Sequence, residues 1–146
     1  MEFAEFDAMF RGALVKRGLK YTRQRAAILE VVFYGEKHLT LDDILVLARK
    51  GYPKVGYATV YRTMKLLNTV GLVEEHKFTD GQARYERMSA DHHDHMICVS
   101  CGKIVEFEDE EIEERQHRLA VKMGFEVVDH RHEIYVRCVE PPCEAV

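Results

Sequence analysis

Residues 92–107 read HHDHMICVSCGKIVEF, and this stretch constrains the fold more tightly than any other part of the chain. It leads from a run of histidines into the pair Cys98 and Cys101, and a second pair, Cys138 and Cys143, follows near the C-terminal end. Two close thiolate pairs can converge on one tetrahedral zinc ion. The spacing therefore predicts a structural Zn(II) site, with two disulfides or four unrelated thiols as the alternatives.

The start of the sequence bears on the choice between zinc and disulfides. It reads MEFAEFDAMF, which lacks the basic-then-apolar pattern of a secretory signal. No apolar run approaches the length that a membrane span needs. We therefore expect a cytoplasmic protein with no membrane partner, and cytoplasmic reduction disfavours disulfides.

The histidine-rich part of residues 92–107 is expected to form a strand, whose successive side chains point to opposite faces. His92 and Asp94 would then share one face, and His93 and His95 the other. Each face offers two donors, so neither completes a site alone. A solvated polar strand is the alternative. Because mixed imidazole and carboxylate donors suit Fe(II), Mn(II), Zn(II) or Co(II), we expect metal binding.

Further nitrogen and oxygen donors are spread along the chain. Those that could complete the two sets are His38, Glu86, Glu106, Glu113, His130 and His132. Two other histidines, His76 and His117, have no supporting neighbours in the sequence. We expect both of them to lie at the surface.

Charge divides the chain into two halves. Residues 1–88 carry 15 Lys and Arg against 11 Asp and Glu, whereas residues 89–146 carry 6 against 14. Six of the eight histidines also lie in the second, acidic half. A basic half suits a polyanion, and an acidic half would repel one unless a cation neutralised it. The halves are therefore expected to have different roles.

The basic half is predicted to be a winged helix-turn-helix domain. Thr22 and Thr40 are good N-caps, and the expected helices cover residues 3–17, 23–33, 41–50 and 56–68. The pair Asp80 and Gly81 between two extended arms predicts a β-hairpin over residues 72–87. Short helices followed by a hairpin are typical of this domain.

The acidic half is predicted to be a small α+β unit. Strands are expected at 93–100 and 104–107, a helix at 108–124 and a long β-prone segment at 125–138. A unit of this size buries little surface and usually needs a metal or a partner subunit. The whole chain is thus predicted as α+β, with a winged-helix domain at 1–87, a hinge at 88–91 and a metal-binding dimerisation domain at 92–146.

The helix expected at 56–68 has the composition of a DNA-recognition helix. Arg62 could reach a base edge in a major groove, while Thr59, Tyr61 and Lys65 could hold phosphates. Lys20 lies before an earlier helix, where contacts to the DNA backbone are typical. The alternative is an ordinary amphipathic helix with its apolar face in the core, because this motif has a weak sequence signature.

Six segments of the sequence resemble the ferric uptake regulator (Fur) family of bacterial metal-responsive repressors. They are LKYTRQRAAILEVV, HLTLDDI, YATVYRTMKLLNTVGLV, ARYE, HHDHMICVSCGKIVEF and the Cys138…Cys143 pair, and they span about residues 14–143. The resemblance implies an N-terminal winged helix for DNA and a C-terminal dimerisation domain. It also implies a zinc site formed by all four cysteines.

The resemblance further implies roles for residues at matching positions. It implies a regulatory site between the domains, with Glu106 nearby, whose ligands are His38, Glu86, His93 and His95. It implies a second regulatory site inside the dimerisation domain, formed by His92, Asp94, Glu113 and His130. Tyr61 and Arg62 match the recognition helix of the family, and Lys20 matches a minor-groove lysine.

By the same resemblance, the expected function is an Fe(II)-responsive repressor that binds AT-rich palindromic operator DNA as a homodimer, with a tetramer as the alternative, and controls iron-uptake genes. Mn(II), Co(II) or Zn(II) could substitute for Fe(II). Peroxide-sensing relatives tend to have aspartate where this chain has Glu86 and Glu106, and zinc-sensing relatives tend to use a further cysteine. A metalloenzyme or a zinc-storage protein is the rival from another class, and neither explains a basic winged helix.

Overall fold

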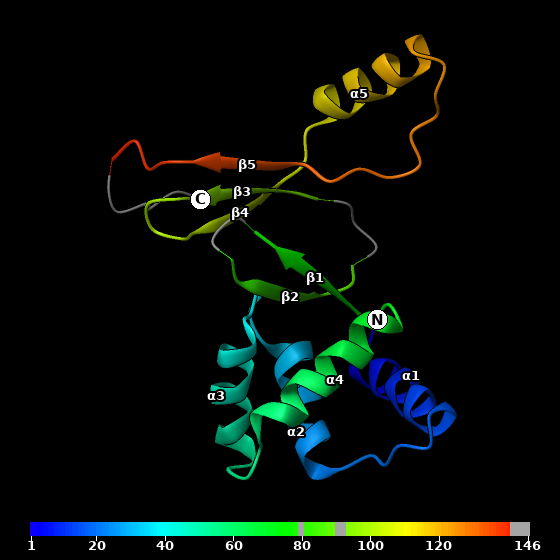
Figure 1. The fold of residues 1–146 in the computed structure, drawn as a ribbon, viewed down its shortest axis with the longest axis vertical. Coiled ribbons are helices and arrows are strands. Elements are labelled where there is room, and N and C mark those ends of the chain that lie inside the picture. Colours follow the sequence, from blue (N-terminus) through cyan, green and yellow to red (C-terminus); the bar gives the residue numbers. More distant parts are fainter. Residues whose placement is uncertain (79–80, 90–92, 141–146) are drawn as a thin grey trace. The chain divides into compact units, whose positions relative to one another are not determined.

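The computed structural model describes residues 1–78, 81–89 and 93–140 (Figure 1). The chain divides into two compact units, Met1–Ser89 and Ala90–Val146. Among the described residues, no helix has both the length and the apolar character needed to cross a membrane. The described parts of the chain contain helices and small sheets, so the fold is α+β, as predicted.

The first unit begins with four helices, all close to their predicted positions. They are α1 (Phe3–Lys16), α2 (Arg23–Tyr34), α3 (Leu41–Gly51) and α4 (Tyr57–Thr69). The hydroxyl of Thr22 accepts a hydrogen bond from the backbone N–H of Arg25 and caps α2. Thr40 and Asp43 form a reciprocal capping box at the start of α3.

The helices enclose one apolar core. Phe6 and Phe10 of α1 are fully buried, as are Ile28 and Leu29 of α2. The inner face of α4 completes this core with Val60, Met64 and Leu67, all fully buried. The amphipathic interpretation of α4 is therefore true of its inner face, which leaves the outer face available for a ligand.

A two-stranded antiparallel sheet follows the helices and completes the winged-helix arrangement (Figure 1). Strand β1 (Val73–Lys77) pairs with β2 (Ala83–Arg87) in a register that places Glu74 opposite Glu86. Gly81 adopts a positive φ of 80°, as a turn glycine can, and Asp80 lies outside the described residues. The hairpin was correctly predicted.

The second unit holds a three-stranded sheet in the order β4–β3–β5. The central strand β3 (Asp94–Cys98) is antiparallel to β4 (Ile104–Phe107) and parallel to β5 (Glu133–Val136). The prediction of a long strand at 125–138 is wrong, because only Glu133–Val136 forms a ladder. Residues 125–132 are irregular, and a β-prone segment becomes a strand only where it pairs with a neighbour.

Helix α5 (Glu110–Lys122) connects β4 to this irregular segment (Figure 1). Asp109 caps it by accepting a hydrogen bond of 3.0 Å from the backbone N–H of Ile112. None of its 13 residues is buried, and Leu119 and Val121 expose more than half of their surfaces. The helix therefore leaves several large apolar side chains exposed in the described part of the chain.

Candidate metal centres and DNA-binding surface

Three cysteine sulfurs meet at one end of the second sheet. The parallel register of β3 and β5 pairs Cys98 with Val136, and this brings the following Cys138 close to Cys98. The Cys138 sulfur lies 3.4 Å from that of Cys98 and 3.8 Å from that of Cys101. Cys143, the fourth predicted ligand, lies outside the described residues.

The redox state and charge of these sulfurs determine whether they suit zinc. Cys98 and Cys101 are thiols. A hydrogen bond from the backbone of Cys101 lowers the pKa of the Cys98 thiol to about 7. A sulfur that ionises near neutral pH is a ready zinc ligand, because metals bind the thiolate. The donor set fits zinc.

In the first unit, His38 lies beside Glu86. The Nδ1 atom of His38 is 3.8 Å from the Oε2 atom of Glu86, whose side chain is 3% exposed. Among the described non-glycine residues, His38 is the only one with a positive φ, at 64°. The next residue, Leu39, pairs with Tyr85 in an isolated β-bridge. This pairing places His38 next to Glu86, the residue that follows Tyr85. Both predicted ligands of this unit therefore come together.

The prediction that His76 lies at the surface is wrong. His76 is buried, with 6% of its surface exposed, and its Nε2 atom lies 2.7 Å from the Oε1 atom of Glu86. Alternation along β1 places His76 on the same side of the hairpin as Glu74, which is the cross-strand partner of Glu86. His117 is exposed as predicted, and its Nδ1 atom lies 3.0 Å from the carbonyl of Glu113.

In the second unit, His93 and His95 lie side by side at the start of the central strand. Their ring centroids are 5.0 Å apart. The antiparallel register pairs His95 with Glu106, and the Nε2 atom of His93 is 3.5 Å from the Oε1 atom of Glu106. His95 is buried at 4% exposure. This face of β3 thus collects two imidazoles and a carboxylate.

The other face of β3 carries Asp94, which is 2% exposed. Its Oδ1 atom is 3.3 Å from the Nε2 atom of His130, and Glu113 belongs to the same cluster of donor atoms. His92, predicted for this set, lies outside the described residues. The structure adds His132, whose Nδ1 atom is 3.9 Å from the Oδ2 atom of Asp94. The sequence identified His132 as a donor but could not assign it, because its position depends on the pairing of β3 with β5.

The proposed DNA contacts lie on or near the outer face of α4. Arg62 is exposed, Tyr61 is 45% exposed and Thr59 is partly buried. The ammonium of Lys65 is 3.6 Å from a carboxylate oxygen of Glu75 and 5.6 Å from the ring centroid of Tyr61. Lys65 therefore forms an ion pair with the hairpin.

Lys20 lies in the loop before α2 and its side chain is exposed. Its carbonyl accepts a hydrogen bond from the guanidinium of Arg25, so the loop is attached to the helix. A fixed loop with an exposed ammonium suits contact with a DNA backbone or groove.

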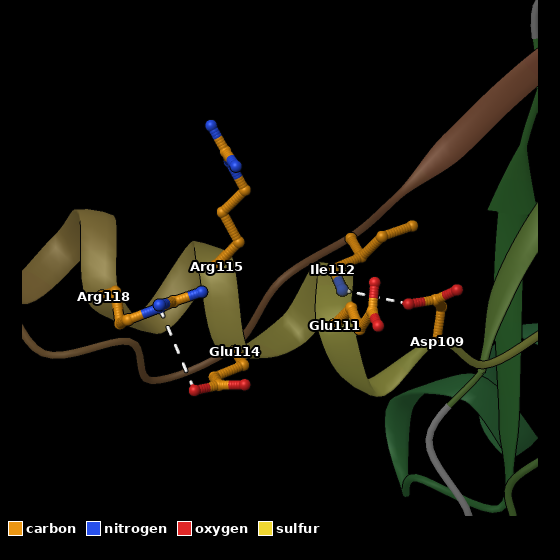
Figure 2. Close-up of a pocket in the computed structure, with 6 residues that line it drawn as sticks. All are labelled: Asp109, Glu111, Ile112, Glu114, Arg115 and Arg118. Carbon is orange, nitrogen blue, oxygen red and sulfur yellow. Dashed lines mark hydrogen bonds and ion pairs between the residues drawn. The ribbon is translucent and has the colours of Figure 1, made fainter.

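A shallow hollow occurs on α5 (Figure 2). Its lining residues are Asp109, Glu111, Ile112, Glu114, Arg115 and Arg118. Figure 2 shows Glu114 and Arg118 linked along the helix by an ion pair, with the Nε and Oε1 atoms 4.0 Å apart. None of these lining residues belongs to the metal-ligand clusters described above.

The chain is similar to known proteins both in sequence and in fold. The family model described as "Ferric uptake regulator family" covers residues 16–135. The ferric uptake regulation protein of Pseudomonas aeruginosa is 42% identical, over 85% of this chain and 93% of that protein. The Helicobacter pylori ferric uptake regulator, whose structure is described as having three functional metal-binding sites, has a TM-score of 0.89 at 29% identity, over 95% of this chain and 93% of that chain.

A second solved structure, a Francisella tularensis ferric uptake regulator with iron, has a TM-score of 0.77 at 35% identity, over 84% of this chain and 93% of that chain. Regulators of this family bind DNA and metal ions, act as dimers and are not enzymes. The alternatives of a metalloenzyme and a zinc-storage protein are therefore excluded. By sequence and by fold, the chain belongs to the ferric uptake regulator family of metal-dependent transcriptional regulators.

Proposed function

We propose that this chain is an Fe(II)-responsive repressor that binds AT-rich palindromic operator DNA as a homodimer and controls iron-uptake genes in the cytoplasm. In this proposal residues 1–87 bind DNA, residues 88–91 act as a hinge, and residues 92–146 bind metal and dimerise. Mn(II), Co(II) or Zn(II) would replace Fe(II) in vitro, because the donors are imidazoles and carboxylates.

The observation that carries the proposal is that each unit has its own cluster of imidazole and carboxylate groups. The first unit offers His38 and Glu86, and the second offers His93 and His95 with Glu106 nearby. An ion that used donors from both units would restrict their relative orientation. Such an ion can raise the affinity for DNA only by the difference between its own affinities for the DNA-binding orientation of the units and for their other orientations. A coupling of ~3 kcal/mol would raise DNA affinity about 150-fold.

The remaining donors have separate roles in this proposal. Cys98, Cys101, Cys138 and Cys143 would hold a structural Zn(II) ion. What supports this role is the closeness of the three described sulfurs, in a unit whose described residues include few buried apolar side chains. His92, Asp94, Glu113 and His130 would form the second regulatory site, and the buried carboxylate of Asp94 beside His130 supports it.

DNA recognition would use α4 and the loop before α2. Arg62 would read a base edge, Thr59, Tyr61 and Lys65 would hold phosphates, and Lys20 would add a groove or backbone contact. The exposure of Arg62 and Lys20 supports these roles. The exposed apolar side chains of α5 support pairing with a second copy, because clusters of exposed apolar residues mark interaction surfaces. A tetramer remains the alternative assembly.

A zinc-responsive or peroxide-responsive regulator of the same family is the competing proposal. Glu86 and Glu106 favour iron sensing over peroxide sensing. All four cysteines are assigned to one structural zinc site, which leaves no further cysteine for zinc sensing.

The deciding experiment is metal analysis of protein purified without oxygen, followed by DNA-binding titrations with each metal. Fe(II) and Mn(II) should each promote binding to an AT-rich inverted repeat. Binding that responds to Zn(II) alone, in protein already loaded with structural zinc, would overturn the iron assignment.

A further inference from the structure

We propose that His76 is a positioning residue for the regulatory metal site: it holds one oxygen of Glu86 and leaves the other oxygen to bind the ion. This inference rests on the proposed function, in which Glu86 is a ligand. It concerns a histidine that the ligand sets described above do not include, and all of the contacts that carry it lie within the first unit.

The geometry divides the two carboxylate oxygens of Glu86 between two histidines. Oε1 is 2.7 Å from the Nε2 atom of His76, which is a short hydrogen-bond distance between buried groups. Oε2 is 3.8 Å from the Nδ1 atom of His38, which is too long for a hydrogen bond but close enough for both atoms to bind one ion. The hydrogen bond therefore determines which oxygen faces the proposed metal ligand.

The hairpin register explains why a histidine is needed here. Glu74 and Glu86 are direct cross-strand partners, and like charges at such positions repel each other. His76 shares their face and lies near both carboxylates, with its Nε2 atom 3.8 Å from Glu74 Oε2. Its N–H donor can stabilise the buried Glu86 carboxylate, which would be costly to bury without hydrogen bonds.

The ring of His76 is itself held in place. It stacks on Phe78, with the ring centroids 5.7 Å apart and an interplanar angle of 4°. Residues two apart on a strand share a face, so β1 and the residue after it supply this contact. A fixed ring gives a fixed donor direction, which is what a positioning residue for a metal ligand requires. Such outer partners typically contribute 10- to 100-fold to metal affinity.

Direct ligation by His76 is the alternative, because Glu74, His76 and Glu86 also have donor atoms within 4.8 Å of one another. The two roles predict different responses to substitution. Glutamine can donate a hydrogen bond to Glu86 but lacks the imidazole nitrogen that a directly ligating histidine would supply, whereas leucine offers neither a hydrogen bond nor a donor atom. A positioning role therefore requires that His76→Gln retain most of the metal affinity that His76→Leu loses.

The test is calorimetric titration of the full, reduced, zinc-loaded chain with Mn(II). The regulatory binding event is identified as the one lost in His38→Ala. His76→Leu should weaken this event about 10- to 100-fold, with unchanged Mn(II) stoichiometry and zinc content. His76→Gln should restore most of the affinity, and the control His117→Leu should behave as wild type. Adding His76→Leu to Glu86→Gln should have no further effect, because His76 acts through Glu86.

Three outcomes would overturn the inference. The first is that His76→Leu binds Mn(II) with wild-type affinity and that its metal-free form unfolds at the same temperature as the metal-free wild type. The second is that His76→Gln loses as much Mn(II) affinity as His76→Leu. The third is that a Mn(II) ion still bound by His38→Ala is lost when His76 is replaced. Either of these two results would identify His76 as a direct ligand. If Glu86→Gln itself left Mn(II) binding unchanged, the proposed metal site would fail. If Glu86→Gln weakened binding and His76→Leu did not, only the role of His76 would fail.

Discussion

Leu39 and Tyr85 exchange two backbone hydrogen bonds, of 3.1 and 2.8 Å, across an isolated β-bridge. The bridge attaches the end of the loop before α3 to the second strand of the hairpin. His38 precedes one partner and Glu86 follows the other, so main-chain pairing brings these two side chains together. Tyr85 is itself in the apolar core, and the pair His38 and Glu86 is therefore attached to the core of the first unit.

The backbone of His38 provides a first prediction. Its φ of 64° is unfavourable for a residue with a Cβ atom and natural for glycine. His38→Gly and His38→Ala should both lose the regulatory Mn(II) ion. In the metal-free state, however, His38→Gly should be more stable than His38→Ala by about 1 kcal/mol. Urea unfolding of both variants measures the difference, and equal stabilities would show that the strain is relieved in solution.

The second prediction concerns the cysteine site. Cys98→Ser or Cys138→Ser should lose about one zinc per chain, because one four-thiolate site holds one ion. The C-terminal half should then be monomeric or unfolded, since metal binding to such a small unit supplies folding free energy. Zinc analysis and sedimentation of reduced protein measure both effects, with Ser100→Ala as the control from the same turn. A full zinc complement and an intact dimer in Cys138→Ser would contradict the assignment.

The third prediction separates base reading from electrostatic attraction. Arg62→Ala should cost ~1–3 kcal/mol on the specific operator and reduce discrimination against other sequences. Lys20→Ala should weaken binding to all sequences more evenly and flatten its dependence on salt. Fluorescence anisotropy at several salt concentrations measures both quantities. An unchanged ratio of specific to nonspecific binding in Arg62→Ala would show that another residue reads the bases.

The fourth prediction compares the two faces of β3. His93→Ala combined with His95→Ala should abolish metal-dependent DNA binding and leave the dimer and the zinc intact. His92→Ala combined with Asp94→Ala should remove a different ion and reduce DNA affinity less, because its proposed site lies within one domain. Metal stoichiometry and DNA titrations on both double variants measure this ranking. Greater damage from the second pair would mean that the bridging set is not the main switch.

Local signals in the sequence identified most of the fold. The caps at Thr22 and Thr40 correctly located the starts of α2 and α3, because capping depends on residues only three apart. Alternation along residues 93–95 correctly separated the two faces of β3, since strand geometry alone determines it. These predictions needed no knowledge of tertiary contacts.

Features that depend on strand pairing were missed. His76 contacts a residue on the next strand, and only the hairpin register shows that Glu86 lies within its reach. The closeness of His132 to Asp94 likewise depends on β5 pairing with β3, which the sequence does not specify. The β-prone residues 125–132 form no strand because propensity without a pairing partner is insufficient.

The alternation of donors along β3 also couples the two proposed metal sites to one strand register. His93 and Asp94 are adjacent in the chain and their side chains point to opposite faces, so a one-residue slip in the pairing of β3 would move its donors from one face to the other. A substitution changes one donor and leaves the others in place. The pairing of β3 with β4 and β5 is therefore a single structural requirement that both proposed sites share.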